Sequence, residues 1–106
     1  MRAIWSYPLT AEPEQTILIP RGFRTLTVNT VQGTPTLYVQ VDARQADLEP
    51  VRVWSFGTGI GINIPHDRLL AYIGSYDRLE GIMTIHVFRE FGTVKPGRKS
   101  VHVKST

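Results

Sequence analysis

Hydrophobic and polar side chains alternate with a period of two along most of the chain, which is the pattern of β-strands with one buried face. The clearest run is 37–42, where Leu37, Val39 and Val41 alternate with more polar positions. Glycine, proline and short polar clusters separate one run from the next. The pattern predicts about seven strands, at residues 3–9, 16–19, 23–31, 37–42, 51–56, 68–73 and 81–88.

The connections between these strands follow from turn chemistry and from breaks in the alternation. Residues 32–35 (QGTP) predict the turn of a hairpin, and the polar stretch 43–50 predicts a surface loop. A second turn is expected at 74–77 (GSYD), and a bulge or strand end near 29–30, where the alternation slips. Apolar side chains on both faces of 51–56 are typical of a central or covered strand.

Composition supports the same fold class. Ten Val, nine Ile and eleven Thr are β-branched, and such side chains suit pleated surfaces better than helices. A chain of 106 residues with 42% hydrophobic residues fits one domain. We therefore expect an all-β fold, a small antiparallel sandwich or barrel of about seven to eight strands.

The chain has no cysteine, so a disulfide framework and a cysteine-based zinc site are excluded. No apolar run approaches the roughly 18 residues of a membrane-spanning helix, and we expect no membrane partner. Residues 1–20 lack the charged start and apolar centre of a secretory signal. The expected location is the cytoplasm in which the protein is made.

Positive charge is concentrated at the C-terminal end. Residues 1–90 hold eight arginines and nine acidic residues, whereas residues 91–106 hold four basic residues and no acidic one. We expect a single β domain at 1–90 and a basic arm at 91–106, which either reaches over a neighbouring subunit or adds an edge strand. The arm also allows contact with nucleic-acid phosphates, although four charges are few for that role. The arm's basic residues are Lys95, Arg98, Lys99 and Lys104.

A glycine-rich segment, 57–61 (GTGIG), follows the predicted strand 51–56. Glycines let backbone N–H groups approach an anion, so the segment is a candidate loop for an anion or a nucleotide-like ligand. A dinucleotide fingerprint requires a helix next, and here INIP is extended and ends in proline. The simpler interpretation is a flexible turn between strands.

Aromatic residues are numerous for so small a core, and a cluster of them next to arginine would form a protein interface or a ring-stacking pocket. The alternative is that the rings fill the core. We expect self-association at such a surface, because small β domains pair their exposed edges and apolar faces. The predicted ligand- or partner-binding residues are Arg52, Trp54, Phe56, Gly57, Thr58, Gly59 and Gly61.

No motif for catalysis is present. There is no thiol and no Gly-x-Ser-x-Gly elbow, and the acidic residues fall at predicted strand ends and turns. The three histidines, His66, His86 and His102, have no metal-ligand spacing, and His86 fits a packed strand position. We expect no enzymatic activity, no cofactor and no metal.

Six segments also occur in a recognisable order: 4–9 (IWSYPL), 14–22 (EQTILIPRG), 32–42 (QGTPTLYVQVD), 57–59 (GTG), 72–75 (YIGS) and 85–88 (IHVF). In this order they resemble a family of short, uncharacterised bacteriophage and prophage proteins, over about residues 3–90. The resemblance implies a phage origin and a β-rich domain. It carries over no catalytic residue, because the family has none established.

Together these observations favour a small non-enzymatic phage accessory protein. It would bind a host protein or a small nucleotide-like, anionic ligand in the host cytoplasm, as a homo-oligomer. The alternative is a virion structural or decoration protein whose basic arm mediates subunit assembly or contacts DNA.

Overall fold

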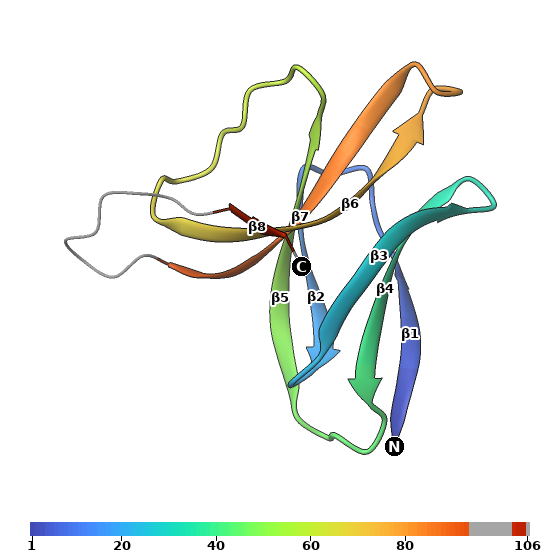
Figure 1. Ribbon diagram of the computed structural model, residues 1–106, viewed down its shortest axis with the longest axis vertical. Helices are drawn as coiled ribbons and strands as arrows, with labels where there is room; N and C mark the ends of the chain where they lie inside the picture. The colour runs from blue at the N-terminus through green and yellow to red at the C-terminus, as the bar shows by residue number, and fades with distance from the viewer. Residues whose placement is uncertain (94–102, 106) are drawn as a thin grey trace.

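The computed structural model describes residues 1–93 and 103–105, and every regular element within them is a β-strand (Figure 1). This confirms the all-β fold that the alternation predicts. No helix that is long and apolar enough to cross a membrane occurs in these residues. The strands are β1 (Arg2–Pro8), β2 (Glu14–Pro20), β3 (Arg24–Val31), β4 (Thr34–Asp42), β5 (Leu48–Gly57), β6 (Arg68–Arg78), β7 (Met83–Thr93) and β8 (Val103–Ser105).

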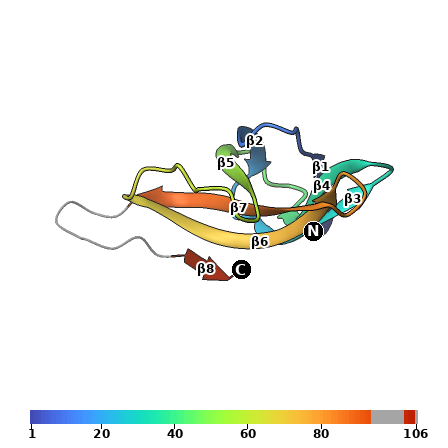
Figure 2. The same ribbon diagram turned by 90° about the horizontal axis from the view of Figure 1, so that it is seen from above.

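The strands form two sheets. One has three strands in the order β1-β4-β3, and the other has five in the order β2-β5-β7-β6-β8. All neighbours are antiparallel except β8, which runs parallel to β6. Seen from above, the long β6–β7 hairpin extends across to the three-stranded sheet (Figure 2). The result is a sandwich-like arrangement with β5 as a central strand, as its two apolar faces predict.

The two sheets enclose one hydrophobic core between their inner faces. Leu37, Val39 and Val41 of β4 are almost completely buried there, together with Val53 of β5 and Val87 of β7. These are alternate positions along their strands, so the period of two in the sequence places them on one face. The core is therefore built mainly from the β-branched residues that dominate the composition.

A second, smaller cluster lies on the other face of the five-stranded sheet. Its buried members are Trp54, Phe56, Leu70 and Phe88, and Ile64 and Tyr72 pack against them. We call these six residues the outer aromatic cluster. Because β5 and β7 bury side chains on both faces, the larger sheet is the centre of the molecule.

The turn expected at 74–77 is wrong, because β6 continues through these residues. The β6–β7 ladder shifts register just before Gly74, so this glycine marks a bulge or irregularity within the strand. The tyrosine in this stretch, Tyr76, is buried in the core. The chain reverses instead at Leu79 and Glu80, whose φ angles are 53° and 55°.

Two further expectations are corrected in position. The irregularity expected at 29–30 lies instead between Thr25 and Thr27, where the β3–β4 ladder shifts register. The loop expected at 43–50 is shorter, because β5 begins at Leu48 and its first residues already pair with β2. Asn29 and Pro50, two residue types that are common in loops, therefore lie within β3 and β5.

Replacing Leu37 with alanine should lower the free energy of unfolding by about 3 kcal/mol, because the change empties part of a fully buried position. Urea denaturation followed by circular dichroism measures the loss. As a control, Ile82→Ala alters a side chain that is 83% exposed and should cost less than about 0.5 kcal/mol. Equal losses in the two variants would contradict this position of the core.

Candidate functional site

The residues predicted to bind a ligand lie along β5 and in the loop that follows it. Arg52, Trp54 and Phe56 share the outer face of β5, and Gly57 is the last residue of the strand. The two rings stack with their centroids 6.1 Å apart, and they are only 8% and 9% exposed. They are therefore packed within the outer aromatic cluster, which leaves little ring surface for stacking on a ligand.

The glycine-rich loop is held to the protein by its own backbone. The Thr58 N–H donates to the Thr84 carbonyl at 3.0 Å, and the Ile60 N–H donates to the Gly57 carbonyl at 3.0 Å. Gly59 has a φ of 83°, a conformation that glycine adopts without strain. Thr58, Gly59 and Gly61 are exposed. This geometry is that of a tight turn, and two of its N–H groups are already used.

The side chain of His86 joins this loop to the sheet. Its Nε2 lies 2.7 Å from the Thr58 hydroxyl, and its Nδ1 lies 3.0 Å from the Tyr72 hydroxyl. Because both ring nitrogens have partners, His86 is the packed, hydrogen-bonded histidine that its strand position predicts. His66 is exposed in a turn, and His102 lies outside the described residues.

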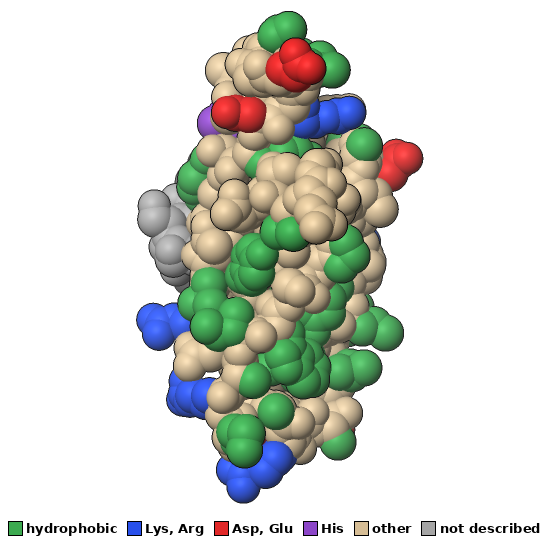
Figure 3. Space-filling model, turned by 90° about the vertical axis from the view of Figure 1, so that its right-hand side faces the viewer, with side chains coloured by type: hydrophobic (Ala, Val, Ile, Leu, Met, Phe, Trp, Pro, Cys, Tyr) green, Lys and Arg blue, Asp and Glu red, His purple; other side chains and the backbone are tan. Residues whose placement is uncertain are grey.

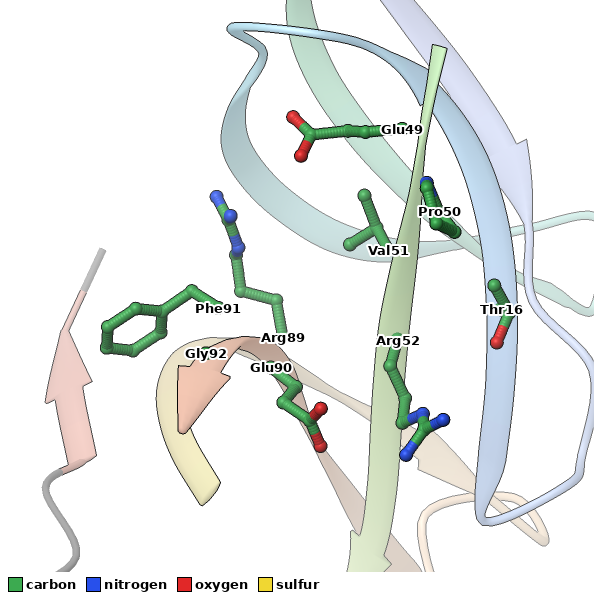
Figure 4. A pocket seen from close by; sticks show the side chains of 9 residues that line it. All are labelled: Thr16, Glu49, Pro50, Val51, Arg52, Arg89, Glu90, Phe91 and Gly92. Carbon is green, nitrogen blue, oxygen red and sulfur yellow. The ribbon is translucent and has the colours of Figure 1, made fainter. Parts of the chain in front are cut away.

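Arg52 lies in the middle of β5, at the point where the pairing of β5 with β7 stops. The last register pair is Arg52 opposite Glu90, and beyond it the two strands diverge. The divergence opens a hollow of about 290 Å³, which we call the β5–β7 notch (Figure 4). Its lining residues are Thr16, Glu49, Pro50, Val51, Arg52, Arg89, Glu90, Phe91 and Gly92.

Two of the four charged side chains of the notch are engaged elsewhere. Glu90 accepts a hydrogen bond from the Trp54 indole N–H at 3.0 Å and lies 3.4 Å from the Arg68 guanidinium. Arg52 forms an ion pair with Glu14 at 3.2 Å. These contacts tie the notch to the outer aromatic cluster and to β2, and they fix its rim.

The contacts of Arg89 differ from those of Arg52 and Glu90. Its guanidinium lies 4.4 Å from the centre of the Phe23 ring, and its buried Nε has no hydrogen-bond partner among the described residues. Burial lowers the pKa of Arg89, and the nearby charge of Glu49 partly opposes this. Figure 4 shows Glu49 from β5 and Arg89 from β7 extending into the same space. The notch therefore holds a half-buried cation beside one carboxylate.

Arg52 is the one predicted binding residue that lines this notch, whereas Arg89 and Glu49 were not predicted from the sequence. The predicted strand stops at 88, whereas β7 continues to Thr93. Extending the alternation by one position places Arg89 on the core-facing side, after Val87. An arginine at a core-facing strand position was thus the feature of the sequence that could have indicated this site.

The C-terminal arm is described only in part. Lys95, Arg98 and Lys99 lie outside the described residues. Lys104 belongs to β8, where its backbone lies opposite Ala71 of β6. Residues 103–105 thus add an edge strand to the five-stranded sheet, which is one of the two arrangements expected for the arm.

Comparison with known protein families identifies the family of this chain. The chain belongs to the family described as Domain of unknown function (DUF7352), whose model matches residues 1–96. The match includes β1 to β7, and therefore the three-stranded sheet, four strands of the larger sheet and the notch. No curated protein and no solved structure matches the chain.

The Glu90→Ala variant should lower the free energy of unfolding by about 1–3 kcal/mol, because the buried Trp54 indole and Arg68 lose their acceptor. The Trp54 environment should also change, which tryptophan fluorescence detects. The exposed Glu80 offers a control, and Glu80→Ala should leave both quantities nearly unchanged. A stability of Glu90→Ala equal to that of the original chain would show that this network contributes nothing.

Proposed function

We propose that this member of the family is a phage accessory protein that binds a small anionic ligand, catalyses no reaction and works as a homo-oligomer. The ligand's anionic group would lie in the β5–β7 notch beside Arg89. The phage origin rests on the order of the six sequence segments described above. The expected location is the host cytoplasm.

One observation carries the proposal, namely that the buried Nε of Arg89 has no hydrogen-bond partner among the described residues. A guanidinium has five N–H donors, and a buried cation without a partner costs folding free energy. Among the described residues, the Arg89 guanidinium contacts the Phe23 ring, and its buried Nε has no hydrogen-bond acceptor. An anion in the notch would supply acceptors in the planar geometry that arginine prefers.

The remaining charges of the notch restrict the kind of anion. Glu49 faces the same space as Arg89, and its carboxylate would repel a ligand of high negative charge. It would also accept a hydrogen bond from a donor on the ligand. A singly charged group with a neighbouring amino or hydroxyl group fits both side chains. A nucleotide-like molecule carries such a combination.

The predicted contacts change accordingly. Arg52 stays at the rim of the proposed site. Trp54 supports the site through its hydrogen bond to Glu90, and Phe56 stacks on Trp54. The glycine-rich loop follows the opposite end of β5 and has no part in the proposed contact. The virion alternative is less favoured, because residues 103–105 of the arm pair with β6 of their own chain.

The test is the Arg89→Met variant, with cyclic adenosine monophosphate, whose phosphodiester carries one negative charge, and inorganic phosphate as probes in isothermal titration calorimetry. We expect the original chain to bind the nucleotide, and the variant to bind it at least about tenfold more weakly. The free energy of unfolding should be unchanged or higher, because methionine keeps an apolar stem on Phe23 and removes a buried cation.

Arg21→Met provides the matched control, because Arg21 is exposed and lies outside the notch. It should leave nucleotide binding unchanged. The proposed site is refuted if both variants bind like the original chain, or if the original chain binds neither probe. A drop in stability in Arg89→Met would refute the view that this cation is unsatisfied.

A further inference from the structure

Within residues 1–93 and 103–105, no strand pairs with the outer edge of β1, which is an edge strand of the three-stranded sheet. The other edge strand of that sheet, β3, lies against β6: a Cβ added at Gly74 would be 3.5 Å from the Val28 nitrogen. Figure 3 looks onto the side of the molecule that carries β1, where hydrophobic side chains run down the middle and charged ones stand toward the rim. This edge is therefore open for another strand.

The hydrogen bonds at the two ends of the β1–β4 ladder show which backbone groups of β1 point outward. The Ala43 N–H donates to the Met1 carbonyl, and the Leu9 N–H donates to the Pro35 carbonyl, each at 2.8 Å. In an antiparallel ladder such hydrogen-bonded pairs recur at every second residue. The odd-numbered residues of β1 therefore bond to β4, and the outward N–H groups belong to Arg2, Ile4 and Ser6.

The side chains on this edge are apolar at its centre. Ile4 is 66% exposed and Trp5 is 40% exposed. Residues 3–11 contain no charged side chain, so the usual protection of an edge strand by charge is missing there. The edge also lacks a proline until Pro8.

We propose that a second copy of this chain pairs with β1, antiparallel and about a two-fold axis at Ile4. In this register Ile4 lies opposite its own copy, and Arg2 lies opposite Ser6 of the second copy. Every outward N–H and C=O group of these three residues then meets its complement. Trp5 lies opposite Ala3, a large side chain beside a small one at the closer, non-hydrogen-bonded spacing.

The β2 edge is a poorer place for the same pairing. Its bonds to β5 at Arg21 and Pro13 show that its outward positions are Glu14, Thr16 and Leu18. Pairing β2 with its copy so that these groups meet puts the Glu14 carboxylate opposite the exposed Leu18. Glu14 is also engaged by Arg52. The uncharged β1 edge therefore suits a second copy better.

This inference rests on the homo-oligomer of the proposed function and names its interface. It uses no residue of the β5–β7 notch. Nucleotide binding and self-association can consequently be measured separately, and either proposal can fail without the other.

Disulfide trapping tests the register directly, because the chain has no cysteine of its own. In the Ile4→Cys variant the two new thiols would face each other across a pair of residues about 5.5 Å apart, within the range of a disulfide. Mild oxidation should convert most of the protein to a covalent dimer. Leu18→Cys, at an exposed position on β2, should form little covalent dimer.

Sedimentation velocity over a range of concentrations tests the association itself. The original chain should sediment as a dimer. Ser6→Pro, which removes one outward N–H, and Ile4→Lys, which brings two charges together on the axis, should both sediment as monomers. Leu18→Lys serves as the control and should remain a dimer.

Circular dichroism establishes whether each variant is folded. If Ser6→Pro does not fold, Ile4→Lys still provides the test, because it changes only an exposed side chain. A monomeric original chain would overturn the proposal. A dimer that persists in Ile4→Lys would also overturn it, as would equal cross-linking of Ile4→Cys and Leu18→Cys.

Discussion

The pairing of β5 with β7 supports the rest of the structure, because these strands bury side chains on both faces of the larger sheet. On one face Val87 belongs to the core between the sheets, and on the other Trp54 belongs to the outer aromatic cluster. The pairing ends at Arg52 and Glu90, where β5 stays with β2 and β7 stays with β6. The notch is the consequence of this separation, so its position is set by the same packing that stabilises the fold.

Electrostatics then single out one side chain in the notch. Glu90 serves Trp54 and Arg68, and Arg52 is paired with Glu14. The Arg89 guanidinium lies beside the Phe23 ring, and its buried Nε has no acceptor among the described residues. Folding gains little from a half-buried cation in this setting, whereas binding an anion would gain a charge-assisted hydrogen bond. The physical cost of Arg89 to the fold is what makes it informative about function.

The sequence predicts the fold class well, because alternation reports directly which side chains share a face. It predicts the site poorly, for two reasons visible in particular residues. Alternation places Trp54 and Phe56 on one face of β5, but it does not tell whether other residues cover that face. Here the other members of the outer aromatic cluster cover it. A glycine in the sequence is compatible with either a turn or a bulge. At Gly74 it marks a bulge or irregularity, because the pairing of β6 with β7 continues on both sides of it. The position of Arg89 depends on a strand that continues beyond its last apolar residue.

The open β1 edge could not be predicted from the sequence either, because the direction of its N–H groups depends on the register with β4. Once the register is known, the edge and the notch are seen to belong to different sheets. Association through β1 would therefore leave both notches of a dimer unobstructed by the new strand pairing. Two such sites on one rigid dimer would bind a ligand with two anionic groups more tightly than one site alone, provided that it spans the distance between them.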